Sequence, residues 1–407
     1  MGATTREGYH RCLAKQVMER PMKRNDLSQS LVVFEQHSTL VAVIEMGLKS
    51  WLVAGLVPGL VRQPLKRQAA DEKLLVKQLY RWRDEAIKAD STIKRIAVAF
   101  EAGRDGFWLA RWLRAHGIEA HVIHPNSVPV PREHRRAKSD RLDTALLMRA
   151  FLGWLRGEAK HCSMVAIPSL AEEDARRPNR EHEHLVGERT SIINRMKAAL
   201  VRLGVRGFNV KLRKAAEQLE KLRTAEGEAL PPNTLAELRR DMARLKLVHE
   251  QIAAIEKERL ARLRRAPRQD THPMVLLLAR VMGIGVETAD MLVHEALTRP
   301  LRDGRAVGRY AGLTGAPDES GQRRREKGLA KAGNARVRRG MIQLAWRWLM
   351  FQKGSALAKW FTARTAHAPR EVRKTMVVAL ARKLLIALWR YVTTGEVPAG
   401  ARLRPAV

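Results

Sequence analysis

Four short apolar runs near the start of this 407-residue chain constrain its fold more than any other feature. They occupy residues 40–44, 51–57, 96–100 and 120–123. Each run has the length of a buried strand and is too short for a core helix. A turn at Gly47 separates the first two runs, which therefore predict a β-hairpin.

Helical spacing of apolar residues fills the intervals between the later runs. Residues 71–89 carry leucines and a tryptophan three to five positions apart, and residues 107–116 form a second helical segment that ends at Gly117. A further helix is predicted from residue 141 to about residue 156. A hairpin followed by alternating helices and strands is typical of an α/β domain with a mixed sheet.

Charge is the feature that most limits the possible partners. The chain has 76 Lys and Arg against 42 Asp and Glu, which gives a formal net charge of +34. Such an excess repels itself unless a polyanion neutralises it, and nucleic acid is the partner that we expect. A membrane surface and an acidic protein are the alternatives. Only Cys12 and Cys162 occur, which excludes a zinc cluster built from cysteines.

No segment predicts insertion into a membrane or secretion. The longest apolar stretch, residues 376–389, is interrupted by Arg382 and Lys383 and is too short to span a bilayer. The N-terminus has no apolar stretch followed by a small-residue cleavage site. We therefore expect a cytoplasmic protein with no membrane partner.

The rest of the chain predicts helices in two further parts. Residues 168–180 are charged and contain proline, as a linker would be, and residues 186–265 have a helical pattern broken at 204–207 and 228–233. Spacings of three, four or seven in the second half of this pattern predict an antiparallel or dimeric coiled coil, with a helical hairpin as the alternative. The predicted parts are a basic extension (1–30), a catalytic domain (31–160), a linker with coiled coil (161–265), a mainly helical C-terminal domain (266–395) and a tail (396–407).

Two pairs of acids stand where carboxylates can converge. Glu45 directly follows the run 40–44, and Glu101 directly follows the run 96–100, so each is expected at a strand end. Asp140 and Asp143 lie three residues apart at the start of the next helix, where they share one face. Carboxylates are the ligands that Mg²⁺ or Mn²⁺ prefers. The alternatives are solvated strand-end charges and a helix-capping pair.

Basic residues surround the second pair of acids and recur near the C-terminus. Arg135, Arg136, Lys138 and Arg141 flank the aspartates, as a phosphate-binding surface beside a metal site requires. Gly283 and Gly285 form a turn before a helix, like the turn of a helix-hairpin-helix that offers backbone N–H groups to a phosphate. A further predicted nucleic-acid surface consists of Arg323, Arg324, Arg325, Lys331, Asn334 and Arg338. A solvated helix face is the alternative for the last of these residues.

Ser320 stands just before that basic run. A serine hydroxyl becomes a nucleophile where neighbouring cations stabilise the alkoxide or the transition state, and arginines together with a metal ion can do so. A serine in a turn is the alternative interpretation.

These motifs together resemble the DEDD transposases of insertion-sequence family one-ten and the Piv-type DNA invertases. The resemblance covers residues 31 to 395. It rests on the segments Val43-Ile44-Glu45-Met46, Phe100-Glu101-Ala102-Gly103, Lys138-Ser139-Asp140-Arg141-Leu142-Asp143, Gly283 through Ala311-Gly312-Leu313, and Ser320-Gly321 to Lys331-Ala332-Gly333-Asn334. The fold implied is a RuvC-like RNase H domain, a coiled-coil linker and a C-terminal transposase domain.

The resemblance also implies roles for single residues and partners. Glu101, Asp140 and Asp143 match three of the four metal-binding acids, and Ser320 matches the serine that links to DNA. Glu45 takes the first acid position, where the family has aspartate. The partners implied are DNA, a structured guide RNA and further copies of the chain in a dimer or tetramer, in a bacterial, nucleoid-associated location.

Three functions are consistent with the sequence. The first is a transposase or recombinase that needs both the acids and Ser320. The second is a RuvC-like nuclease that cuts with metal-activated water and does not need Ser320. The third is an inactive RNA- or DNA-binding protein, which the substitution at Glu45 favours. We expect the first.

Overall fold

The computed structural model describes residues 29–30, 32–103, 106–129, 139–158, 161–210, 214–320, 323–329 and 332–405; for residues 126, 316–320 and 323–327 only the backbone is described. Most of the predicted N-terminal extension, together with Arg135, Arg136, Lys138 and Lys331, lies outside the described residues. The described chain divides into two compact units, one ending at Glu173 and the other beginning at Asp174.

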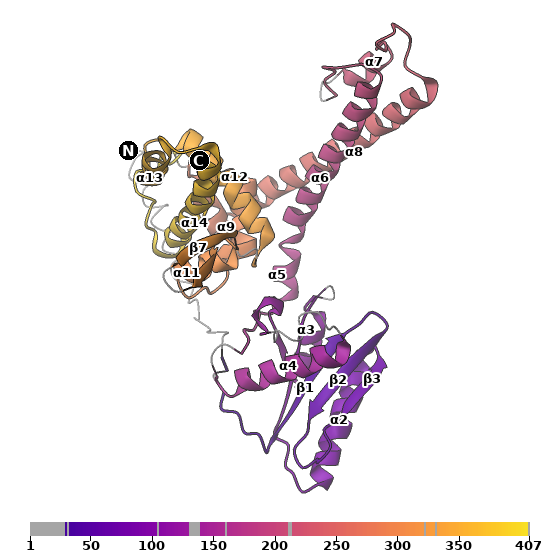
Figure 1. The fold of residues 1–407 in the computed structure, drawn as a ribbon, viewed down its shortest axis with the longest axis vertical. Helices are drawn as coiled ribbons and strands as arrows, with labels where there is room; N and C mark the ends of the chain where they lie inside the picture. The colour runs from indigo at the N-terminus through magenta and orange to yellow at the C-terminus, as the bar shows by residue number, and fades with distance from the viewer. Residues whose placement is uncertain are drawn as a thin grey trace. The chain divides into compact units, whose positions relative to one another are not determined.

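A five-stranded mixed sheet forms the centre of the N-terminal unit (Figure 1). Its strands are β1 (Thr39–Met46), β2 (Ser50–Leu56), β3 (Leu65–Ala69), β4 (Arg95–Phe100) and β5 (Glu119–Val122). The spatial order is β3-β2-β1-β4-β5, in which β1, β2 and β3 are antiparallel and β1, β4 and β5 are parallel. The predicted hairpin and the four predicted strands are therefore confirmed. Strand β3 was not predicted, because its side chains are mostly exposed and form no apolar run.

Helices cover both faces of this sheet. On one face, α2 (Glu72–Lys88) and α3 (Trp108–Ala115) pack on Leu40 and Ile44 of β1; on the other, α4 (Asp140–Leu155) packs on Val41 and Val43. Successive residues of a strand point to opposite faces, so the two sets alternate along β1. Apart from the 3₁₀ turn η1 (Pro125–Ser127), the remaining named element is the short helix α5 (Leu170–Asp174). The three predicted helices are confirmed.

A pair of long antiparallel helices begins the C-terminal unit (Figure 1). Helix α6 (Arg177–Arg202) pairs with α8 (Pro232–Arg265), with α7 (Ala215–Leu219) between them in the sequence. Asn179 contacts Arg259 and Arg195 contacts Asp241, so the register runs in opposite directions along the two helices. The structure thus shows a helical hairpin within one chain, and the coiled coil stays a prediction. The segment predicted as a linker, residues 168–180, contains the boundary between the two units, together with α5 and the first turn of α6.

The remainder of this unit is mainly helical. Its elements are α9 (His272–Ala279), α10 (Val286–Leu292), the π-helix η3 (Val293–Leu297), α11 (Gly304–Tyr310), β6 (Gly315–Ser320), β7 (Arg323–Leu329), α12 (Ala335–Phe351), α13 (Ala356–Thr365) and α14 (Arg370–Thr394). One apolar core, centred on the fully buried Trp348, joins the helices from α9 to α14. The antiparallel hairpin β6–β7 was not predicted.

These observations confirm the coarse fold class, an α/β part followed by a mainly helical part. The RNase H/RuvC assignment stays a prediction. Among the described helices, none combines the length and the apolar content that crossing a membrane requires.

Candidate active site

Strand register places Glu45 and Glu101 side by side. Ile44 of β1 is level with Phe100 of the parallel neighbour β4, and each glutamate is the next residue along its strand. Ala97 and Ala99 of β4 pack on the face that α4 covers, as do the odd-numbered residues of β1. By the alternation of strand side chains, both half-buried glutamates belong to that face. The structure therefore brings the two strand-end acids together, as the sequence predicted.

Asp140 and Asp143 occupy the first turn of α4. The capping role that the sequence left open for them belongs to Ser139, whose hydroxyl accepts the N–H of Leu142 at 3.3 Å. Neither aspartate is therefore the N-cap. Both still gain from the helix dipole, because the N-terminus of a helix favours negative charge.

Arg67 locates the start of α4 relative to the two glutamates. Its Nη2 lies 2.7 Å from Oδ2 of Asp140, and both side chains are more than half exposed. Arg67 is level with Leu52 of β2, which is level with Glu45 of β1. Arg67 therefore lies in the same row across the sheet as the two glutamates, two strands away from Glu45. It binds Asp140 at this end of the sheet. Arg67 was not found from the sequence, since it lies on the exposed strand β3.

The four acids consequently lie at one end and on one face of the sheet. Oxygen ligands of this kind fit a hard divalent cation, and the guanidinium of Arg67 offsets part of the negative charge of Asp140. Arg141 is exposed beside Asp140 and extends positive charge from the acids toward solvent. The roles of the four acids as metal ligands and of Arg141 in phosphate contact stay predictions.

Ser320, in the C-terminal unit, is the last residue of β6. The register of the β6–β7 hairpin sets Ser320 opposite Arg323, Glu319 opposite Arg324, and Asp318 opposite Arg325. The backbone thus aligns the predicted nucleophile with the basic run that follows it. The sequence grouped these residues correctly without predicting the hairpin that aligns them.

Close backbone packing forms the base of this hairpin. Gly312 (φ +64°) and Gly333 (φ +92°) both have left-handed conformations. A Cβ would lie 2.0 Å from a backbone oxygen at Gly312 and 2.5 Å from one at Gly333, so neither position has room for a side chain. The N–H of Asn334 donates to the carbonyl oxygen of Tyr310 at 2.7 Å. The two chain segments that carry the hairpin are therefore joined where they leave the helical core.

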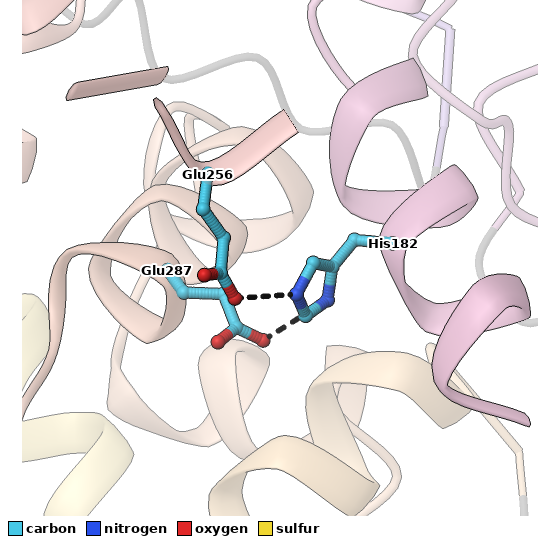
Figure 2. A group of neighbouring side chains, drawn as sticks. All are labelled: His182, Glu256 and Glu287. Atoms are coloured by element: carbon cyan, nitrogen blue, oxygen red, sulfur yellow. Dashed lines mark hydrogen bonds and ion pairs between the residues drawn. The ribbon is translucent and has the colours of Figure 1, made fainter. Parts of the chain in front are cut away.

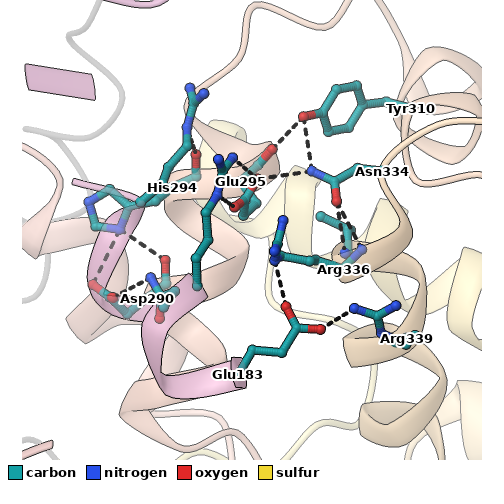
Figure 3. A network of polar contacts seen from close by, with 12 residues as sticks. Glu183, Asp290, His294, Glu295, Tyr310, Asn334, Arg336 and Arg339 are labelled. Atoms are coloured by element: carbon teal, nitrogen blue, oxygen red, sulfur yellow. Dashed lines mark hydrogen bonds and ion pairs between the residues drawn. The ribbon is translucent and has the colours of Figure 1, made fainter. Parts of the chain in front are cut away.

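A buried carboxylate anchors that base (Figure 3). Glu295, 1% exposed, accepts from Nδ2 of Asn334 at 3.0 Å and from Nε of Arg180 at 3.0 Å, while Tyr310 donates its hydroxyl to the Glu295 carbonyl at 2.7 Å. Burial raises the pKa of Glu295, but the hydrogen bonds and charge of Arg180 outweigh it, so the pKa lies below its ordinary value. The Asn334 side chain also caps α12, and its contact with nucleic acid stays a prediction.

Further contacts bind α6 to the same part of the unit. Glu183 of α6 forms ion pairs with Arg336 and Arg339 of α12 (Figure 3). Arg338, on the same helix, lies with Nη1 3.5 Å from the carbonyl oxygen of Ala332. The first turns of α6 are therefore bound to the helix that follows the Ser320 hairpin.

Gly283 and Gly285 lie in the turn between the contacting helices α9 and α10. Gly283 has φ +91°, and Gly285 is the N-cap of α10, with no atom within 4 Å of where its Cβ would be. The predicted turn is present. Its contact with DNA stays a prediction.

Comparison with known proteins agrees with these features. Residues 275–361 match the family model described as "Transposase IS116/IS110/IS902 family". A curated protein of Sinorhizobium fredii named "Putative transposase y4rJ" is 40% identical over 371 residues, which cover 89% of this chain and 93% of that protein. An identity of this extent includes residues of both compact units, so the chain belongs to the IS116/IS110/IS902 family of transposases.

Proposed function

We propose that this transposase cuts and rejoins DNA at the ends of an insertion sequence. In the proposal Glu45, Glu101, Asp140 and Asp143 hold Mg²⁺ or Mn²⁺ in an RNase H/RuvC-like domain, and Ser320 is the nucleophile. What supports it is that two strand-end glutamates lie side by side and that Arg67, in the same row across the sheet, binds Asp140 in the first turn of α4. Bound divalent ions would polarise the scissile phosphate and stabilise the leaving oxygen.

The chemistry of the chain's own residues is a transesterification. The hydroxyl of Ser320 loses its proton as its oxygen forms a new ester bond to phosphorus, the bridging P–O bond breaks, and the departing deoxyribose oxygen takes up a proton in exchange. Attack of a DNA hydroxyl on the phosphoserine then reverses the step and joins new strands. One phosphodiester replaces another, so the exchange needs no external energy source. Arg323, opposite Ser320 in the hairpin, and Arg141, beside the acids, are the cations that we assign to phosphate contact.

A structured guide RNA is the second part of the proposal. A net charge of +34 provides enough positive charge to neutralise two kinds of nucleic acid. Base pairing between guide and DNA would supply sequence specificity, while the protein would contact backbone and shape. The basic residues near Ser320 and near the acids would then contribute affinity more than sequence choice.

Covalent attachment of protein to DNA tests the proposal. The protein is incubated with element ends, the flanking RNA and Mg²⁺, then denatured and examined on a gel. We expect a protein–DNA adduct that S320A abolishes, and we expect D140N to abolish both adduct and cleavage. Cleavage that persists in S320A without an adduct would support the water-using nuclease instead. Tight DNA binding with neither cleavage nor adduct would support the inactive binding protein.

A further inference from the structure

One histidine of the C-terminal unit faces two carboxylates from different helices, which lie together on one side of its ring (Figure 2). His182 of α6 is 6% exposed; its Nε2 lies 3.1 Å from Oε1 of Glu256 on α8, and its Nδ1 lies 3.3 Å from Oε1 of Glu287 on α10. The two glutamate side chains are about half exposed. We name these three residues the His182 triad.

The two contacts of His182 differ in kind. Nε2 has hydrogen-bonding geometry toward Glu256, whereas Nδ1 and Glu287 lie at an ion-pair distance of 3.3 Å. A neutral imidazole carries one N–H and one lone pair, so it can donate to only one of the two carboxylates. A metal ion between one ring nitrogen and its carboxylate would offset the charge of both glutamates.

The observed distances fit a metal ion in that place. Bonds of about 2.0–2.2 Å from a metal to nitrogen and oxygen, at angles of about 90–110°, separate the two ligand atoms by roughly 2.9–3.5 Å. An ion bound through one ring nitrogen would use one of the two contacts, Nε2 to Glu256 at 3.1 Å or Nδ1 to Glu287 at 3.3 Å, and each lies within that range. One ligand atom from each of the three residues lies within 4.8 Å of the others, so a modest swing of one half-exposed glutamate completes a three-ligand set.

A second triad holds the three helices in register. Asn179, Arg259 and Asp290 each lie three residues from a member of the His182 triad, on the same three helices. Asn179 Nδ2 donates to Asp290 Oδ2 at 2.7 Å, and Arg259 Nη2 donates to Asn179 Oδ1 at 3.0 Å. All three are buried. The backbones that carry His182, Glu256 and Glu287 are therefore positioned before any ion binds, which lowers the cost of forming the site.

We propose that the His182 triad binds a divalent first-row transition ion of the Zn²⁺ class. An imidazole nitrogen with two carboxylate oxygens suits Zn²⁺ and its neighbours, whereas Mg²⁺ prefers oxygen ligands alone. The bound ion links α6, α8 and α10 and so attaches the long helical pair to the helices that support the Ser320 hairpin. The site is separate from the four acids of the proposed function and does not depend on them.

Zinc binding to the full-length protein tests this site. Protein stripped with a chelator is dialysed against Zn²⁺ in excess Mg²⁺, which competes for sites made only of carboxylates. Metal content and competition with a chromophoric chelator then give stoichiometry and affinity. We expect one tightly bound Zn²⁺ per chain, lost in H182Q and at least 10-fold weaker in E256Q and E287Q. These two glutamine variants retain shape at half-exposed positions, so they test the site even if H182Q fails to fold.

Matched variants separate this site from other metal ligands. E258Q on α8 and H184Q on α6 change exposed residues near the triad and should bind Zn²⁺ like the wild type. The D140N/D143N double variant should also keep its Zn²⁺, because the two sites are independent. Zinc should raise the melting temperature of the wild type and not that of E256Q. Equal zinc binding in wild type, H182Q and E256Q would overturn the proposal. Absence of tight zinc binding in the wild type would also overturn it.

Discussion

Glu45 is the single residue at which this chain differs from the acid pattern that its resemblance implies. Its side chain is longer than that of aspartate by one methylene, about 1.5 Å. Register places it beside Glu101, another long acid, so the two can reach the same ion from neighbouring strands. We expect E45D to keep measurable activity, because an acid remains.

E45Q is the sharper test at this position. Glutamine keeps the size of the side chain and removes the charge. We expect single-turnover strand cleavage in Mg²⁺ to fall about 100-fold, the factor that corresponds to about 2.7 kcal/mol of lost transition-state stabilisation. Cleavage at the wild-type rate in E45Q would show that Glu45 is not a metal ligand.

His294 predicts a pH dependence of stability. Burial lowers its pKa, but its hydrogen bond and ion pair with Asp290 outweigh this, so the pKa lies above the ordinary value of 6.5. Because the folded-state pKa is raised, the stabilisation is fully present below pH 6.5 and is lost as the pH rises through the folded-state pKa. We expect H294Q to be less stable than the wild type by about 2 kcal/mol at pH 5.5, with a smaller difference at pH 9.

Urea unfolding of both proteins at several pH values measures this effect. H184Q, which changes an exposed histidine on α6, is the control and should show little difference from the wild type at any pH. A gap between wild type and H294Q that stays constant from pH 5.5 to 9 would contradict the assignment.

Candidate residues were predictable from the sequence only where the residues next to them in the chain indicate their position in the fold. Glu45 and Glu101 directly follow apolar runs, so a strand end was evident for each. Arg67 and Glu295 have no such mark, because their roles depend on partners 73 and 115 residues away in the sequence. Asn334 was noticed as part of a basic surface, whereas its cap and its bond to Glu295 required the fold.

Among the elements, the β6–β7 hairpin depends on the two glycines at its base. We expect G333A to destabilise the protein by about 3 kcal/mol, because the substitution adds a steric clash to the strain of a left-handed backbone. G328A is the matched control: Gly328 also has a left-handed φ of +71°, but open space surrounds its Cβ position. It should cost about 1 kcal/mol.

Thermal unfolding and strand cleavage together check the role of this base. If the base positions Ser320, G333A should lose cleavage at temperatures where it is still folded, and G328A should not. Equal effects of the two variants on stability and on cleavage would show that the base has no positioning role.

Elements with an apolar period were predictable, and elements without one were not. The four buried strands and the helices between them follow from short apolar runs and 3.6-residue spacing. Strand β3 and the β6–β7 hairpin carry mainly charged and small residues, so neither has an apolar pattern in the sequence. Their pairing depends instead on the neighbouring strands and on the close packing of glycines. The first turn of α6 resembled a linker because its polar residues, Asn179 and Arg180, bind buried acids of the same unit.

At the scale of the whole molecule, the charge of +34 predicts a steep salt dependence of DNA binding. Each phosphate contact releases counterions, so a protein with many such contacts loses about 10³-fold or more in affinity between 50 and 200 mM salt. R141Q should reduce the slope by about one contact. R81Q, which changes an exposed arginine already paired with Glu85, should leave the slope unchanged. Flat binding across this salt range would show that the charge serves another purpose.

The last prediction concerns how the proposed nucleophile meets the proposed metal ligands. Ser320 and the four acids belong to different compact units, and the pair α6–α8 lies between them in the sequence. Exchange of two DNA strands needs at least two nucleophiles, which an assembly with paired sites provides. We therefore expect the acids of one subunit to act with Ser320 of another.

Mixing two inactive variants decides between sharing and a site within one chain. S320A keeps intact acids and D140N keeps an intact serine, so a mixed dimer or tetramer contains one complete site only if the two parts come from different subunits. We expect each variant alone to be inactive and the mixture to recover up to about a quarter of the wild-type cleavage, because random pairing makes roughly half of the dimers mixed and each mixed dimer has one of its two sites complete. If each chain folds its own serine onto its own acids, every chain in the mixture lacks one half of its site. Mixtures that contain demonstrated mixed oligomers and are still inactive would therefore show a site within one chain.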